Sequence, residues 1–131
     1  MSGSSIDHVL AESRRSLDRV RPEDLEAELA AGALVVDIRP VENREAEGLL
    51  PGAQVVDRNV LEWRLDPTSP HRIPDSDDPD RRVILVCNEG YASSLAAETL
   101  QRIGLRRATD LVGGYRGWRA VHPEPVTRDG P

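Results

Sequence analysis

Lysine and phenylalanine are absent from the sequence, and cysteine occurs only once, as Cys87. All 17 basic residues are therefore arginines, which excludes chemistry that needs a lysine amine, such as Schiff-base catalysis or phosphate binding by a Walker-type lysine. A single cysteine also excludes an internal disulfide and a zinc site built from several cysteines. Any thiol chemistry in this chain depends on Cys87 alone.

A basic surface is lacking as well. The 17 basic residues are outnumbered by 23 acidic ones, so the formal net charge is −6. Proteins that bind nucleic acids or anionic membrane surfaces usually carry a net positive charge or a basic patch, which this composition does not indicate. No run approaches the roughly 18 apolar residues of a membrane span. Charges interrupt the apolar stretches of the N-terminal region, which predicts no signal peptide. We therefore expect a cytoplasmic protein without nucleic-acid or membrane partners.

The length of 131 residues, with 38% hydrophobic and 31% charged residues, is typical of one globular domain. Apolar residues with a period near 3.6 predict an amphipathic accessory helix within residues 1–21. A second helix is expected from Pro22 to a stop at Gly32. We assign 22–121 to the main domain and 122–131, rich in proline, to a flexible tail.

Short apolar runs alternate with helical patterns through the rest of the chain. Strands are expected at 33–38, 53–56, 82–87 and 108–112, and helices at 60–65, 94–103 and 115–121. Residues 66–80 contain four prolines and five aspartates, which predicts a solvated surface loop. This order indicates an α/β fold, a three-layer sandwich with a mainly parallel central sheet and helices on both faces.

In such a sheet the site lies at the carboxyl ends of the strands. By that rule the ends of three expected strands lie at the same edge of the sheet. The first carries Asp37 and Arg39, the second Arg58 and the third Cys87. Cys87 leaves a buried strand and enters a short turn with Gly90 before a helix, so backbone N–H groups of residues 88–93 and the positive helix end favour thiolate over thiol. The alternative is a buried structural cysteine that ends a strand.

Four segments carry further information when they are taken together. They are Asp37-Ile38-Arg39, Glu47-Gly48-Leu49-Leu50-Pro51-Gly52-Ala53, Val86-Cys87-Asn88-Glu89-Gly90-Tyr91-Ala92-Ser93-Ser94, and Leu111-Val112-Gly113-Gly114-Tyr115-Arg116-Gly117-Trp118. In order and spacing they resemble the rhodanese-like domain of single-domain sulfurtransferases, over about residues 22–121. The resemblance implies that Cys87 takes a sulfane sulfur from a donor, holds it as a persulfide, and passes it to a thiol or to cyanide.

One position departs from the family pattern. Active rhodanese loops resemble Cys-x-x-Gly-x-Arg/Lys, and this chain has Ala92 where the cation is expected. A phosphatase or arsenate-reductase loop resembles Cys-x5-Arg, and the corresponding residue here is Ser93, so the phosphate clamp of that chemistry is missing. We therefore expect poor use of thiosulfate, a dianion, and better use of a persulfide donor.

The resemblance and the strand-end rule together give a set of candidate site residues. Cys87 is the nucleophile, the substrate contacts are Asn88, Glu89, Gly90, Tyr91, Ala92, Ser93, Arg58 and Arg39, and the supporting residues are Asp37 and Ser94. Each of the flanking groups also has a plainer interpretation. Asp37 and Arg39 can simply brace a strand end, Arg58 can be solvated, and Glu89 is expected to point away from the sulfur. Tyr91 is expected at the pocket mouth or as an exposed loop aromatic.

Other conspicuous residues are assigned to structure. Trp63 and Trp118 are expected to be core anchors, and His71 reaches Cys87 only if the 66–80 loop folds over the site. The aspartates of that loop lack the glycine of an EF-hand, so we predict no metal and no cofactor. The predicted partners are a small sulfur donor and a thiol, cyanide or protein acceptor. The alternative function is a non-catalytic binding or redox-sensing module, with Ala92 marking the loss of substrate binding.

Overall fold

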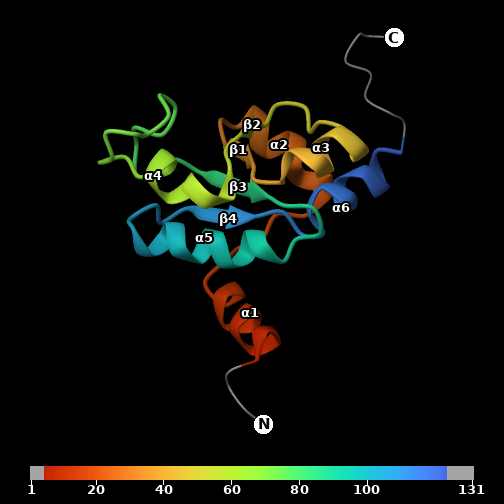
Figure 1. Ribbon diagram of the computed structural model, residues 1–131, viewed down its shortest axis with the longest axis horizontal. Coiled ribbons are helices and arrows are strands. Elements are labelled where there is room, and N and C mark those ends of the chain that lie inside the picture. Colours follow the sequence, from red (N-terminus) through yellow and green to blue (C-terminus); the bar gives the residue numbers. More distant parts are fainter. Residues whose placement is uncertain (1–4, 124–131) are drawn as a thin grey trace.

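The structure is a computed structural model that describes residues 5–123 (Figure 1). Its sheet has the order β2-β1-β3-β4, and all three strand pairs are parallel. The elements are α1 (Ile6–Arg14), the 3-10 turn η1 (Pro22–Asp24), α2 (Leu25–Ala30), β1 (Leu34–Asp37), α3 (Val41–Glu47), β2 (Gln54–Val55), the 3-10 turn η2 (Arg58–Val60), α4 (Leu61–Leu65), β3 (Val83–Val86), α5 (Ala92–Arg102), β4 (Ala108–Asp110) and α6 (Gly114–Val121). The expected α/β fold with a parallel sheet is confirmed.

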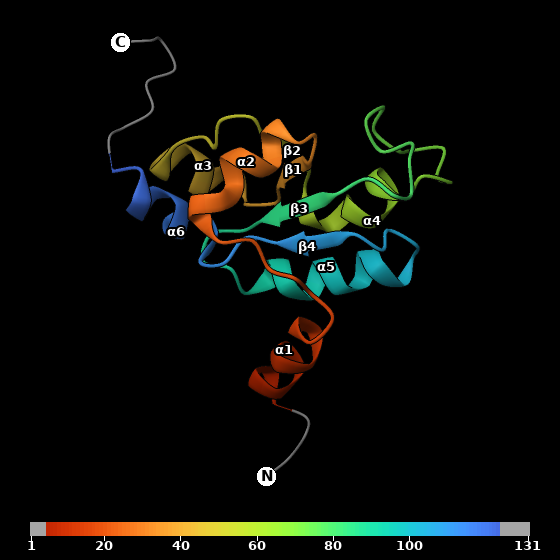
Figure 2. The ribbon, with the colours of Figure 1, turned by 180° about the vertical axis from the view of Figure 1, so that it is seen from behind.

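The central strands β1 and β3 are buried at every position, because helices cover both faces of the sheet. Alternate residues point to opposite faces. Val36 and Leu85 pack with α4 and α5, whereas Val35 and Ile84 pack with α2 and α6. Figure 2, seen from behind, shows α2 and α5 on opposite sides of β3 and β4. Burial of each such side chain contributes about 1.5–3 kcal/mol, and these two clusters form the core.

The accessory helix expected within residues 1–21 covers only the first part of that segment. Helix α1 ends at Arg14 and is followed by a turn at residues 15–16, after which the chain continues without helix to Val20, which forms a parallel bridge to Leu111 beyond β4. Helix α1 packs on the outer side of α5, as Figures 1 and 2 show. The non-helical course carries the chain from that outer helix to the edge of the sheet, which a continued helix would not reach. The tail expected from residue 122 lies, from 124 onward, outside the described residues.

Three further expectations need correction. Helix α3 was not anticipated, because its residues are mostly charged and none of them is buried, so it has no apolar period. The loop 66–80 has no helix or strand, but Ile73 is buried in the core, so this loop is not solvated throughout. Trp63 is 59% exposed on α4 and is not a core anchor, whereas Trp118 is buried as expected. None of the helices within residues 5–123 is long and apolar enough to cross a membrane.

Candidate active site

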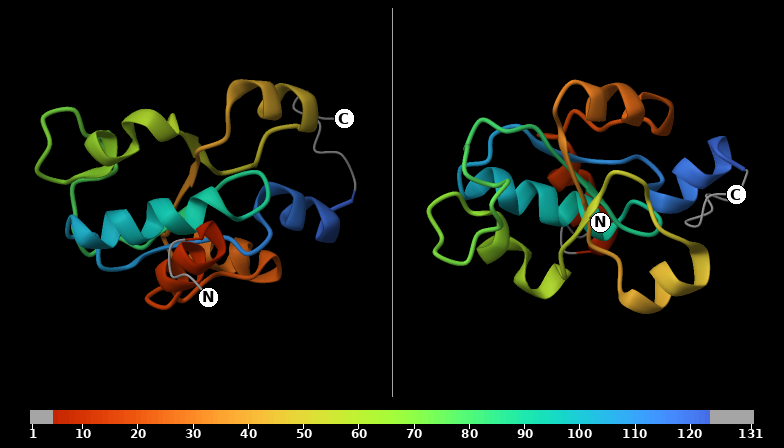
Figure 3. Two further views of the ribbon diagram at one scale, coloured as in Figure 1. Left: turned by 60° about the horizontal axis from the view of Figure 1, so that its bottom comes forward. Right: turned by 90° about the horizontal axis from the view of Figure 1, so that it is seen from above.

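The strand ends of β1 and β3 bring the first site residues together. Asp37 is paired with Val86 in the parallel register, and the amide of Ile38 donates to the carbonyl of Val86 at 2.9 Å. Cys87 is the next residue along the chain, so it lies beside the Asp37–Arg39 segment. The left view of Figure 3 shows the loop after β3 next to the start of α6.

The loop wraps its backbone around the sulfur of Cys87. The amides of Gly90 and Ser93 donate to Sγ, with N to S distances of 3.1 and 3.4 Å. Cys87 itself is 8% exposed. Two N–H donors directed at one sulfur stabilise negative charge on it, which is what a thiolate or a persulfide requires.

The loop conformation depends on glycine. Gly90 has a φ of 88°, and a Cβ there would lie 2.8 Å from the amide nitrogen of Gly113. The Gly113-Gly114 turn packs directly beneath the loop, where the amide of Tyr115 donates to the carbonyl of Cys87 at 2.8 Å. A Cβ on Gly114 would overlap that same carbonyl. The Gly-Gly pair and Gly90 therefore fit together as one tightly packed unit.

A cavity of about 380 Å³ lies in front of the sulfur. It is lined by Ile38, Arg39, Pro40, Arg58, Cys87, Asn88, Glu89, Tyr91 and Ala92. The amides of Tyr91 and Ala92 have no hydrogen-bond partner among residues 5–123 and belong to the N-terminal end of α5. These N–H groups are available to a second sulfur atom or an anion bound in front of Cys87.

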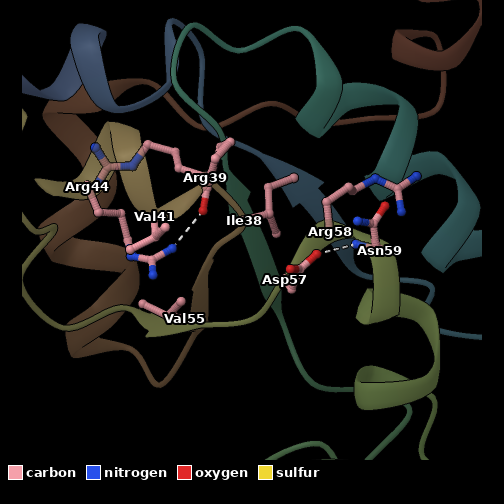
Figure 4. Close-up of a pocket in the computed structure, with 9 residues that line it drawn as sticks. Ile38, Arg39, Val41, Arg44, Val55, Asp57, Arg58 and Asn59 are labelled. Carbon is pink, nitrogen blue, oxygen red and sulfur yellow. Dashed lines mark hydrogen bonds between the residues drawn. The ribbon is translucent and has the colours of Figure 1, made fainter. Parts of the chain in front are cut away.

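A second cavity of about 410 Å³ adjoins the first and shares Ile38, Arg39, Pro40 and Arg58 with it. Figure 4 shows Arg44 and Arg58 on opposite sides of this cavity, with Ile38 and Asp57 between them. Arg44 donates to the carbonyl of Arg39 at 2.7 Å, and Arg58 pairs with Glu62 at 3.0 Å. Arg58 and Arg39 both line the two cavities, and of these two side chains Arg58 is the exposed one.

Arg39 lies where the bracing interpretation of the Asp37–Arg39 pair places it. Its side chain has no exposed surface, and its guanidinium group binds both carboxylate oxygens of Asp37 and the carbonyl of Gly48. The ring of Tyr115 lies against it, 3.9 Å from the ring centroid to Cζ. A guanidinium held in this way braces the end of β1, and its role as an anion contact stays a prediction.

The other loop side chains also have defined partners. Glu89 binds Arg116 at 2.6 Å, which draws its carboxylate toward α6. Asn88 donates to Glu47 at 3.2 Å. Hydrogen bonds from Arg116, and to a smaller extent from Asn88, hold the pKa of Glu47 below its usual range. Tyr91 is exposed and borders the cavity, and Ala92 leaves the cavity wall without a loop cation.

Behind the loop lies a polar network that the sequence analysis missed. Asp110, at the end of β4, is completely buried and accepts hydrogen bonds from the hydroxyls of Ser93 and Ser94, both at 2.7 Å. Ser93 Oγ in turn lies 3.2 Å from Cys87 Sγ. The carboxylate of Asp110 is paired with Arg19 at 2.8 Å. The sequence pattern predicted Asp110 as part of a strand and gave it no role at the site. A carboxylate within an apolar run does, however, indicate a buried ion pair, because a carboxylate is almost never buried without a partner.

No histidine borders the cysteine cavity, and His71 is held elsewhere by a hydrogen bond from its amide to Ser69 Oγ at 3.0 Å. Within residues 5–123 there is no group of three or more histidine, cysteine, aspartate or glutamate residues arranged to hold a metal ion. The described residues around the sulfur are one thiol, backbone amides and the arginines Arg39 and Arg58. This set can accept a sulfur atom on Cys87 and stabilise the resulting anion.

Comparison with known proteins gives consistent results. The family model for the rhodanese-like domain matches residues 21–121. Thiosulfate sulfurtransferase GlpE of Stutzerimonas stutzeri strain A1501 is 32% identical over 114 residues, which cover 85% of this chain and 93% of that protein. The protein of the same name from Pseudomonas fluorescens strain SBW25 is 34% identical over 110 residues, which cover 83% and 91%.

Solved structures show the same fold. A protein of unknown function from Rhodopseudomonas palustris, described as a possible tyrosine phosphatase, superposes with a TM-score of 0.83, at 30% identity over 97% of both chains. A human single-domain sulfurtransferase superposes with a TM-score of 0.63 at 24% identity, covering 81% of this chain and 96% of that one.

Proposed function

The chain belongs to the family of rhodanese-like domains, and we propose that it is a sulfurtransferase in which Cys87 carries the transferred sulfur. The observation that supports this assignment best is the pair of amides, from Gly90 and Ser93, that donate to Cys87 Sγ beside an open cavity. A phosphatase is not supported, because Ser93 stands where Cys-x5-Arg chemistry needs its arginine.

In the first step the Cys87 thiolate attacks the sulfane sulfur of a donor. A bond forms between Cys87 Sγ and that sulfur, while the bond between the sulfur and the rest of the donor breaks. The leaving group, sulfite from thiosulfate or a thiolate from a persulfide, takes the bonding electron pair. The free amides of Tyr91 and Ala92 then stabilise the outer sulfur of the persulfide.

In the second step the thiolate of an acceptor, or cyanide, attacks the outer sulfur. The new bond joins that sulfur to the acceptor, and the bond to Cys87 Sγ breaks with its electron pair returned to Cys87 as thiolate. The cavity of about 410 Å³ beside Pro40 and Arg58 offers space for the body of an acceptor. A small thiol fits this space, and a protein that inserts an exposed cysteine is the alternative acceptor.

The donor we propose is a persulfide or another donor of low charge rather than thiosulfate. The cavity wall is largely apolar, with Ile38, Pro40 and Tyr91, and Ala92 supplies no cation. Arg58 is the remaining contact for an anionic donor. We place this activity in the cytoplasm, a reducing compartment that keeps a lone thiol free.

The direct test is the intact mass of the protein after incubation with several sulfane-sulfur donors. We expect the addition of one sulfur atom, lost again when a thiol acceptor or cyanide is added. Cys87→Ser should take up no sulfur and should remain folded. A parent protein that gains no sulfur from any donor, while Cys87 still reacts with iodoacetamide, would favour the non-catalytic module.

A further inference from the structure

Two arginines of the N-terminal segment contact the back of the cysteine loop. Arg14, the last residue of α1, donates from Nη2 to the carbonyl of Gly90 at 2.7 Å and from Nε to Ser94 Oγ at 3.0 Å. Arg19 donates to the same Gly90 carbonyl at 3.0 Å and binds Asp110. One loop carbonyl thus accepts two charged donors, from residues 76 and 71 positions away in the sequence.

These contacts fix the peptide between Gly90 and Tyr91. The described residues contain no cis peptide, so the Gly90 carbonyl and the Tyr91 N–H point in opposite directions. With the carbonyl held toward the arginines, the N–H is held toward the other side, where Tyr91 borders the cavity in front of Cys87. Charged donors on the carbonyl also polarise the peptide, which makes its N–H a stronger donor.

The charges behind the loop do not cancel. Asp110 balances Arg19, but within residues 5–123 Arg14 has no carboxylate partner, and its guanidinium group lies 5.8 Å from the centre of the Tyr91 ring. A net positive charge therefore remains at the back of a loop that carries Ala92 in place of a cation. Both arginines lie outside the residues 21–121 matched by the family model.

From this arrangement we propose that Arg14 and Arg19 are positioning residues for sulfur transfer. They orient the Gly90–Tyr91 peptide toward the transferred sulfur, and their charged donors on the Gly90 carbonyl strengthen the Tyr91 N–H as a donor to that sulfur. This inference rests on the proposed function, since it assigns the Tyr91 amide to the sulfur carried by Cys87. Neither arginine touches the substrate.

The test compares Arg14→Ala with Arg15→Ala, its neighbour in sequence. Arg15 is an apt control because its side chain is 76% exposed and, among residues 5–123, pairs only with Glu12 of α1. Sulfur loading of Cys87 is measured in single turnovers with two donors of different charge, thiosulfate and an aryl thiosulfonate. We expect Arg14→Ala to load about three- to tenfold more slowly with both donors, the equivalent of one net hydrogen bond, and Arg15→Ala to match the parent. Arg14→Lys should restore part of the rate, because it keeps the charge and one donor.

Equal slowing with both donors, at temperatures where Arg14→Ala is folded, supports an effect on the loop rather than on the donor. Slowing with thiosulfate alone would overturn the inference, because Arg14 would then act as a distant charge for the anion. Unchanged loading would overturn it as well.

A second measurement, the rate of Cys87 alkylation by iodoacetamide at neutral pH, needs no sulfur transfer. If the parent takes up no sulfur, the proposed function fails, and slower alkylation in Arg14→Ala than in Arg15→Ala would still support the positioning of the loop.

Discussion

The two sides of the cysteine loop differ in how their charges are held. On the back, Asp110 is completely buried, and Arg19 binds both of its carboxylate oxygens. On the front, the cavity wall is largely apolar, and its cation, Arg58, is half-exposed and paired with Glu62. Charge at the back is desolvated and geometrically fixed, whereas charge at the front is screened by water. The conformation of the loop therefore depends on contacts at its back, whereas the front is an open and largely apolar cavity.

Removing Arg19, the partner of the buried Asp110, should give the largest effect. Arg19→Ala leaves the Asp110 carboxylate buried without its ion pair, and such a loss costs about 3–5 kcal/mol. We expect thermal unfolding and urea unfolding to report this loss. Arg21→Ala, which removes an exposed pair with Glu23, should stay within about 0.5 kcal/mol of the parent.

Adding Asp110→Asn to Arg19→Ala should restore part of the stability, since the double variant no longer buries a charge. If Arg19→Ala and Arg21→Ala unfold at the same temperature, the Asp110–Arg19 pair is no more important to stability than an exposed pair, and the description of the back as desolvated is wrong.

Introducing a cation at position 92, on the cavity side of the loop, should give the next largest effect, this time on activity. Ala92→Arg places a charge at the cavity wall, and a charge-assisted contact contributes about 1.5–3 kcal/mol, or roughly ten- to a hundredfold in kcat/KM. We expect this gain for thiosulfate and a smaller gain for an aryl thiosulfonate. Ala92→Gln, of similar length but uncharged, is the control. A parent that already uses thiosulfate as well as Ala92→Arg does would show that charge at position 92 is not limiting.

Arg58→Ala, also on the cavity side of the loop, should have a smaller effect on activity. We expect the kcat/KM for thiosulfate to fall about two- to fivefold, in keeping with a partly solvated contact. The thermal midpoint should barely change, because the pair with Glu62 is an exposed i, i+4 pair worth about 0.3–0.5 kcal/mol. Arg64→Ala serves as the control, since Arg64 lies on α4 and donates to the carbonyl of His71. An equal loss of kcat/KM in Arg58→Ala and Arg64→Ala would show that Arg58 is not a specific contact for the anionic donor.

The smallest effect is expected at the rim, where Glu47 joins Arg116 to Asn88 of the loop. Arg116 lowers the pKa of Glu47 from 4.5, so its contribution to stability is present above about pH 4.5 and is lost as the pH falls through the lower pKa of the folded state. Urea midpoints measured between pH 6 and pH 3 should fall less steeply for Glu47→Gln than for the parent. Glu45→Gln should follow the parent curve, and identical slopes for Glu47→Gln and the parent would contradict the assignment.

The sequence alone determined the parts of this protein that depend on local pattern. The apolar runs around Val36 and Leu85 predicted the two central strands, because strands buried on both faces must be apolar at every position. The position of Cys87 after one of them, before a glycine turn and a helix, predicted the loop at the carboxyl edge of the sheet. The lack of a cation at Ala92 was also visible directly.

Only the tertiary structure decided which charges surround that loop. Arg14 and Arg19 lie more than 70 residues from Gly90, and nothing in their local sequence indicates that α1 ends early and sends the chain to the sheet edge. In the same way, Arg39 turned inward to Asp37, although its position at a strand end suited an anion contact equally well. The physical reason is that hydrophobic periodicity is a local property of the chain, whereas the partner of a charged side chain depends on which distant segments packing brings within hydrogen-bond distance.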